Sequence, residues 1–125
     1  MREIKFRAQD IASNKWLFGD LRHHKDDVCI FDQGGTKGEQ VKRETVGQFT
    51  GLRDINGKDI YEGDILDVNY ADEESRLEVR FVRGVFAFLW NGDLDDEFPC
   101  NAPTHEWAKV IGNIYDNPEL LNKEE

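Results

Sequence analysis

Thr50–Val68 reads TGLRDINGKDIYEGDILDV, and this stretch decides the fold. Two turn signals lie close together in it, Asn56-Gly57 and Gly63-Asp64, with an apolar run on either side. Asn and Gly tolerate the positive φ angles of tight hairpin turns, and glycine allows a sharp change of direction. We therefore expect these four residues to form a structural turn motif, in which the Asp64 carboxylate accepts hydrogen bonds from backbone N–H groups.

Alternating apolar residues predict half-buried strands before and after this motif. Arg2–Ala8 should bury one face, and Glu3, Lys5 and Arg7 should lie on the other; the buried set is Ile4, Phe6 and Ala8. Trp16–Leu21 is a second apolar run that can close a hairpin with the first. Arg76–Arg83 should bury Leu77, Val79 and Phe81.

The last strands differ from these in pattern. Val85–Trp90 is apolar throughout, which predicts a central strand covered on both faces. Trp107–Tyr115 predicts a final strand with a bulge at Gly112. Glu39–Thr45 remains open between an edge strand and an irregular segment. Short strands separated by turn signals indicate a mainly β protein, a small barrel or sandwich.

Charge is unevenly distributed along the 125 residues, which carry a formal net charge of −10. Met1–Arg53 has a net charge of +2, and Asp54–Glu125 has a net charge of −12. An acidic half disfavours contact with a nucleic-acid backbone, where affinity comes from Lys and Arg, and favours a basic protein partner.

Nothing in the sequence indicates export or a membrane. The two cysteines, Cys29 and Cys100, do not form a CxxC pair, and no apolar run approaches the ~18 residues of a membrane span. The first residues, MREIKFRAQD, lack the apolar core of a signal peptide. We expect a cytoplasmic protein with reduced thiols.

Several residue clusters could in principle carry chemistry, and each has a stronger structural interpretation. A zinc site would need a close pair among its potential ligands, which are His23, His24, His105, Cys29 and Cys100. The acidic loop Asn91–Glu97 lacks the spacing of a calcium-binding EF-hand loop. Gln33–Gly38 lacks P-loop spacing. Glu62 and Asp64 have no nucleophile or histidine near them in sequence. We therefore expect no metal, no cofactor and no catalytic residue.

Three blocks of sequence, in this order, resemble the YopX family of phage and prophage proteins. They are REIKFRAQD, QFTGLRDINGKDIYEGDIL and VIGNIYDNPELL. The family usually has an aromatic residue where this chain has Gln9, which affects a local packing contact. The resemblance implies a β-rich fold with an N-terminal β appendage (1–53), an SH3-like β-barrel (54–121) and a frayed tail (122–125). It implies no activity, since the family is of unknown function.

The function we expect is that of a non-enzymatic phage or prophage accessory protein, in the cytoplasm of the bacterial host, that binds another protein. Its interaction surface would be the acidic tip formed by Asp93, Asp95, Asp96 and Glu97. One alternative is an acidic mimic of nucleic acid that blocks a host DNA-binding protein. The other is a binder of single-stranded nucleic acid, which would need exposed aromatics beside Arg76, Arg80 and Arg83. The aromatics available for a groove are Tyr61, Tyr70, Phe86, Phe88 and Trp90. The sequence leaves a homo-oligomer open.

Overall fold

The computed structural model describes residues 3–32, 35, 37–70, 73–95, 97–99 and 104–121. The protein is mainly β: these residues form antiparallel strands and three short 3-10 turns, and none of them is in an α-helix. The chain divides into two compact units, Met1–Phe49 and Thr50–Glu125. Two sheets organise the strands, with the orders β4-β3-β2-β1-β5-β6 and β10-β9-β8-β7-β11.

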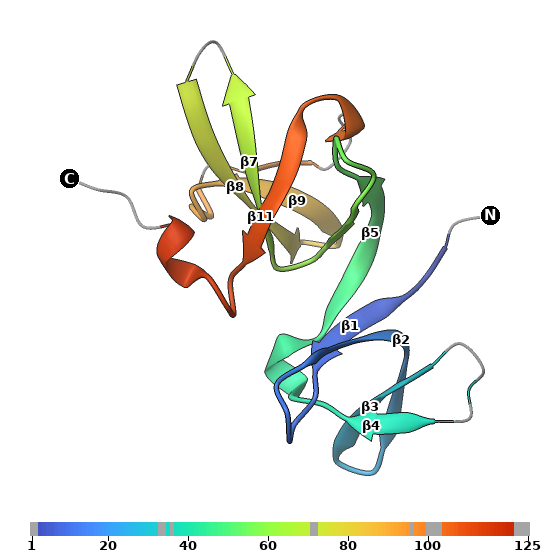
Figure 1. Cartoon of the computed structure of the whole chain (residues 1–125). Coiled ribbons are helices and arrows are strands. Elements are labelled where there is room, and N and C mark those ends of the chain that lie inside the picture. Colours follow the sequence, from blue (N-terminus) through green and yellow to red (C-terminus); the bar gives the residue numbers. More distant parts are fainter. Residues whose placement is uncertain are drawn as a thin grey trace. The chain divides into compact units, whose positions relative to one another are not determined.

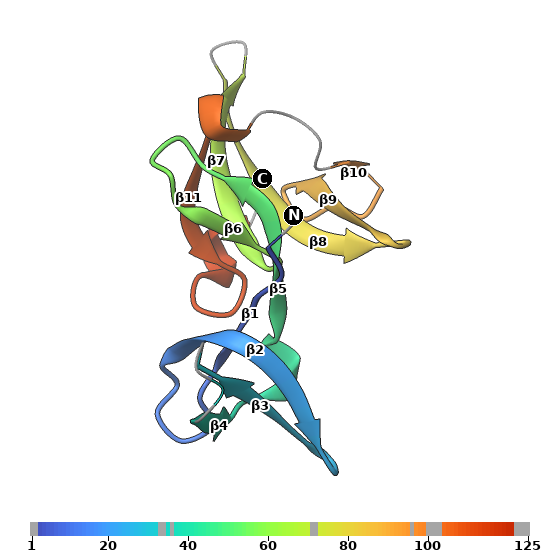
Figure 2. The ribbon, with the colours of Figure 1, turned by 90° about the vertical axis from the view of Figure 1, so that its right-hand side faces the viewer.

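The first unit is a meander of short strands (Figures 1 and 2). Its strands are β1 (Phe6–Gln9), β2 (Trp16–His24), β3 (Asp27–Phe31) and β4 (Gly38–Gln40), followed by the 3-10 turn η1 (Arg43–Thr45). The segment expected to be either an edge strand or irregular contains both, because β4 is the edge of the sheet and η1 follows it.

A small hydrophobic core holds the first unit together. It consists of Ala8, Val28, Ile30 and Val41, with Phe6, Leu17, Leu21 and Val46 packed against it. The burial expected for the first strand is partly wrong. Ile4 is exposed, whereas Arg7 is buried, with its guanidinium 4.8 Å from the centre of the Trp16 ring. A guanidinium on an aromatic ring can be buried at moderate cost, so period-two alternation fails here.

Strand β5 (Gly47–Arg53) belongs to both units. Gln48 and Gly47 pair with Phe6 and Arg7 of β1, and β5 then continues beside β6 (Asp59–Tyr61). We expected the division of the chain after Arg53. The compact units found here divide between Phe49 and Thr50, within β5.

The second unit is built around a β-meander (Figure 1). Its strands are β7 (Asp64–Tyr70), β8 (Glu73–Val82) and β9 (Val85–Trp90), which pair in sequence order. The short β10 (Glu97–Pro99) pairs with β9, and β11 (Ala108–Asn113) returns to pair with β7. Two 3-10 turns, η2 (Thr104–Glu106) and η3 (Pro118–Leu121), flank β11 in the sequence. The register of β11 shifts between Val110 and Gly112, so the predicted bulge is confirmed.

One face of the meander covers the core of the second unit. The buried members are Ile60, Leu66, Val68, Leu77, Val79, Phe88 and Ala108, and four others pack against them: Leu52, Trp90, Trp107 and Val110. Phe81 was expected in this core and is instead about half exposed, with a relative exposure of 49%. Phe81 follows Leu77 and Val79 on the same face of β8, but it lies beyond the buried residues, near the β8–β9 turn, where it packs on Phe86.

The opposite face of the meander is also partly covered. Ile65, Glu78 and Leu89 form one cross-strand row through β7, β8 and β9, and all three are buried. The C-terminal turn η3 contacts β8 next to this row, where Arg76 Nη1 donates to the carbonyl oxygen of Leu120 at 3.0 Å. Val85–Trp90 is therefore a central strand with buried residues on both faces, although Val85 at its start is exposed.

Candidate functional site

The Asn56-Gly57 turn is organised by a neighbouring carboxylate, Asp54. The Asp54 Oδ1 atom accepts hydrogen bonds from the N–H groups of Asn56 and Lys58, both at 2.9 Å. Gly57 has a φ of 80°, whereas Asn56 does not have the positive φ expected of it. The turn is therefore not a two-residue primed turn, and the Asp54 carboxylate stabilises it by accepting backbone hydrogen bonds.

Asp54 also fastens this turn to the last strand. Its Oδ2 atom accepts a hydrogen bond from the Val110 N–H at 3.0 Å. Burial of Asp54 opposes its ionisation, but donation from the N–H groups of Val110, Lys58 and Asn56, together with the positive charge of Lys58, outweighs burial and lowers the pKa of this carboxyl below its usual value. Asp54 is an ionised structural group, and sequence reasoning missed it because nothing local indicates that Val110 lies beside it.

The second turn signal is also architectural. Gly63 has a φ of 95°, its N–H donates to the Val79 carbonyl at 2.7 Å, and its own carbonyl accepts the Ile114 N–H at 2.9 Å. The buried Asp64 accepts the Tyr61 N–H at 2.7 Å through Oδ2. Asp64 thus accepts a backbone N–H within the turn, which is the kind of contact expected of it.

The acidic tip expected as an interaction surface is the connection between β9 and β10. Asp93 and Asp95 are exposed, and Asp93 Oδ1 accepts the Asp95 N–H at 2.9 Å. Leu94 lies between them and is 52% exposed. Glu97 forms an ion pair with Arg83, and Asp96 lies outside the described residues.

The tip of the β8–β9 hairpin exposes apolar surface in the same unit. Phe81 and Phe86 pack edge to face with ring centroids 5.1 Å apart, and Phe81 and Val85 are both about half exposed. The Arg83–Glu97 ion pair joins this tip to β10. We call Phe81, Val85, Phe86, Asp93, Leu94, Asp95 and Glu97 the acidic–apolar surface.

The three arginines of β8 and its turn do not present a cationic row. Arg80 donates from Nε and Nη2 to the buried Glu78, at 2.8 and 2.6 Å. Arg76 donates to the Leu120 carbonyl, and Arg83 pairs with Glu97. Phe81 lies on the opposite face of β8 from Arg80 because successive strand residues alternate.

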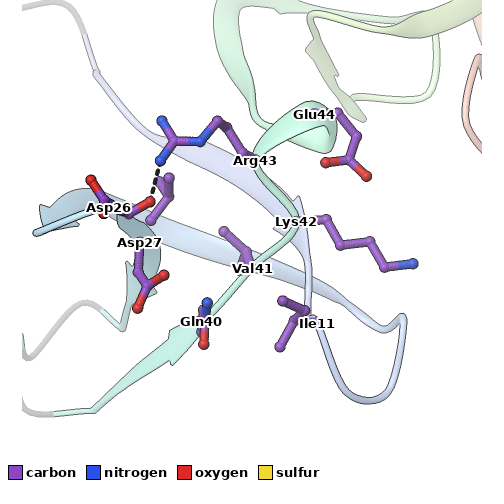
Figure 3. Close-up of a pocket in the computed structure, with 9 residues that line it drawn as sticks. Ile11, Asp26, Asp27, Gln40, Val41, Lys42, Arg43 and Glu44 are labelled. Carbon is purple, nitrogen blue, oxygen red and sulfur yellow. Dashed lines mark hydrogen bonds between the residues drawn. The ribbon is translucent and has the colours of Figure 1, made fainter.

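A cavity of about 360 Å³ opens on the first unit between β3 and the segment that follows β4 (Figure 3). Val28 and Val41 of the core form its apolar floor, and the exposed Ile11 lies at its edge. Arg43 crosses to donate to the carbonyl oxygen of Asp26 (Figure 3). Lys42, Glu44 and Asp27 add charges of both signs around the opening, so the cavity has no single electrostatic preference.

A second cavity, also of about 360 Å³, lies on the outer face of β2, β3 and β4. Its lining includes Arg22, His24, Cys29, Phe31 and Gln40. Cys29 has a free, half-buried thiol. No signal in the sequence predicted this cavity, because its residues come together only through the register of three strands.

No metal site is found among the residues that the structure describes. There is no group of three or more His, Cys, Asp or Glu side chains able to hold an ion. His23, His24 and His105 are exposed, and Cys100 lies outside the described residues. Of the glycine-rich stretch Gln33–Gly38, only Gly35, Lys37 and Gly38 are described.

The described aromatic residues that were proposed to line a binding groove are buried or half-buried. Tyr61 and Phe88 are buried, Phe86 and Trp90 are half-buried, and the side chain of Tyr70 is outside the described set. These four described rings thus belong largely to the core. Phe81, which sequence alternation had assigned to the interior, is instead an exposed ring of the second unit.

Comparison with known proteins identifies a family and a similar solved structure. Residues 5–122 match the YopX family, described as YopX protein. The chain belongs to the YopX family. The crystal structure of protein EF1440 from Enterococcus faecalis is similar to this YopX-family chain, with 26% sequence identity and a TM-score of 0.60 over 98% of this chain and 100% of that one. No curated protein matches. Within the described residues, no helix has the length and hydrophobicity needed to cross a membrane.

Proposed function

We propose that this YopX-family chain is a non-enzymatic protein-interaction module that binds a basic protein partner through the acidic–apolar surface. We further propose that it serves as an accessory protein of a phage or prophage, in the cytoplasm of the bacterial host. The family resemblance supports the second statement, and the surface of the second unit supports the first.

One observation carries the proposal: in the loop after β9 the exposed Leu94 stands between the exposed carboxylates of Asp93 and Asp95. The Arg83–Glu97 ion pair joins β10 to the β8–β9 turn, which lies at the other end of β9 and exposes Phe81 and Val85. Apolar surface supplies most of the binding energy at protein interfaces, while complementary charge selects the partner and speeds its approach. The net charge of the second unit, −11 over Thr50–Glu125, favours a basic partner.

We also propose that the second unit is an SH3-like barrel. Three hydrogen bonds support this, because they join the end of β5 and the residues after it to η2 and β11. Asp54 accepts from Val110, the Ile55 N–H donates to the Ala108 carbonyl at 2.9 Å, and Thr104 Oγ1 donates to the Arg53 carbonyl at 2.8 Å. Such bonds bring the first and last strands of the unit together, which is what barrel closure requires.

The alternatives have less support. A binder of single-stranded nucleic acid needs cations beside exposed rings, but Arg80 and Arg83 are paired with carboxylates. A mimic of nucleic acid needs carboxylates at regular intervals on one face, and within the described part of the chain the acidic–apolar surface interleaves its carboxylates with Leu94, Phe81 and Val85.

The experiment is a comparison of three forms of the full-length chain, each used to capture proteins from a bacterial lysate. The wild type is compared with the double variant Val85→Ser/Leu94→Ser. Its matched control is Ile4→Ser/Ile55→Ser, which also removes two exposed apolar side chains. The proposal predicts one protein that the wild type and the control retain and the Val85/Leu94 variant loses. Equal retention by all three forms, or by none, would contradict it.

A further inference from the structure

The sheet of the first unit has two faces of different character. Leu21, Val28, Ile30 and Val41 face the core. On the opposite face, the register aligns Arg22 with Cys29 and Gln40, and aligns Phe31 with Gly38. His24 and Asp27 form the next pair toward the hairpin end. Residues capable of binding therefore collect on the face that the core does not use.

These side chains enclose the second cavity rather than lying flat. Its volume of about 360 Å³ lies in the range of small-ligand sites. The Phe31 ring rests on the backbone of Gly38, where an added Cβ would lie only 2.4 Å from the ring. Glycine at this position thus allows the ring to lie across β4.

Two flat groups form the wall of the cavity. The Arg22 guanidinium lies over the Phe31 ring, with its carbon 4.1 Å from the ring centre. Aromatic rings and guanidinium planes are the groups on which proteins stack nucleobases. Arg22 has no carboxylate partner among the described residues, and its charge is available to an anion.

Two other polar groups line the cavity. Gln40 lies two strands across from Arg22 in the same row, and Asp27 lies nearer the hairpin end. Gln40 offers an amide donor and acceptor, and Asp27 offers a carboxylate at the hairpin end. A carboxylate repels a phosphate but accepts hydrogen bonds from an exocyclic amino group. The cavity therefore suits a ligand with an anion at one end and an amino-bearing aromatic ring at the other.

We infer that this cavity binds a nucleoside monophosphate whose base carries an exocyclic amino group. The base stacks on the outer face of the Arg22 guanidinium, whose other face lies over Phe31. Its amino group faces Asp27 and Gln40, and the phosphate accepts hydrogen bonds from the N–H groups at the edge of the guanidinium. This site is on the first unit and is independent of the protein-binding surface proposed for the second.

Adenosine monophosphate is the probe, titrated into the full-length chain while backbone amide shifts are followed by NMR. We expect shifts concentrated in β2, β3 and β4 and a dissociation constant of about 1 mM or lower. Arg22→Gln and Gln40→Ala should each weaken binding about tenfold, since each removes a ligand contact from an exposed side chain. Lys15→Gln, which removes another exposed cation of the first unit, should leave the affinity unchanged.

Three results would overturn the inference. The first is an absence of shifts in these strands. The second is inorganic phosphate binding as tightly as adenosine monophosphate, which would exclude a contribution from the base. The third is an equal loss of affinity in Lys15→Gln and Arg22→Gln, which would indicate only general charge attraction. Wild-type-like spectra of the free variants establish that each is folded.

Discussion

At the scale of single residues, Asp54 links the Asn56-Gly57 turn to the last strand. Its two oxygens accept three backbone hydrogen bonds. Asp54→Asn replaces one acceptor with an NH₂ group that faces an N–H donor. We expect a loss of about 1–3 kcal/mol in the free energy of unfolding, because a buried donor is left unsatisfied. Urea unfolding at neutral pH measures this, and Asp95→Asn, an exposed carboxylate, should change it little.

The same carboxyl predicts how stability depends on pH. The pKa of Asp54 is lower in the folded protein than its usual value of 3.8. The unfolded chain therefore binds this proton more readily, so the stabilisation is fully present above pH ~4 and is lost as the pH falls through the folded-state pKa. Unfolding measured at decreasing pH, from about pH 5 downward, should show a shallower decline in stability for Asp54→Asn than for the wild type. Parallel declines would contradict the assignment.

At the scale of elements, the bulge in β11 is held together with the turn that follows it by side-chain hydrogen bonds. The Asn117 side chain accepts the Asn113 N–H at 3.3 Å, and Asn113 Oδ1 accepts the N–H groups of Tyr115 and Asp116. An added Cβ at Gly112 would lie 2.5 Å from Asn117 Oδ1. Glycine in the bulge thus leaves room for the side chain that holds the turn.

Gly112→Ala should therefore loosen the C-terminal turn. We expect a loss of about 1–3 kcal/mol in the free energy of unfolding, since the new methyl group overlaps Asn117. Faster hydrogen exchange at the Asn117 and Leu120 amides should accompany it. In an Asn117→Ala background the same substitution should cost less, because its steric partner is gone. Equal costs in the two backgrounds would show that the contact does not hold the turn.

Elements also show how far the sequence predicts the structure. Local sequence predicts the β character, the turn at Gly63-Asp64 and the bulge at Gly112. Alternating apolar residues indicate strands, and glycine indicates turns and bulges. Local sequence does not predict the burial of Arg7 or the exposure of Phe81. The first depends on contact with Trp16, and the second depends on where the core ends. The cavity beside Arg22 depends on the register of three strands, which local sequence does not specify.

At the scale of the whole molecule, charge is divided between the units. Met1–Phe49 has a net charge of +1 and Thr50–Glu125 a net charge of −11. If the acidic–apolar surface binds a basic partner, its local carboxylates should matter more than the total charge. Long-range attraction is screened by salt, so the affinity should also fall as ionic strength rises.

The most direct test of the proposed function is the affinity of the captured partner for two variants of equal net charge. Asp93→Asn/Asp95→Asn removes two carboxylates from the acidic–apolar surface. Asp20→Asn/Glu39→Gln removes two exposed carboxylates from the first unit. Titration calorimetry at two salt concentrations should show at least about a tenfold weaker affinity for the first variant, with a smaller salt dependence, and an unchanged affinity for the second. Equal affinities of the two variants would contradict binding at this surface.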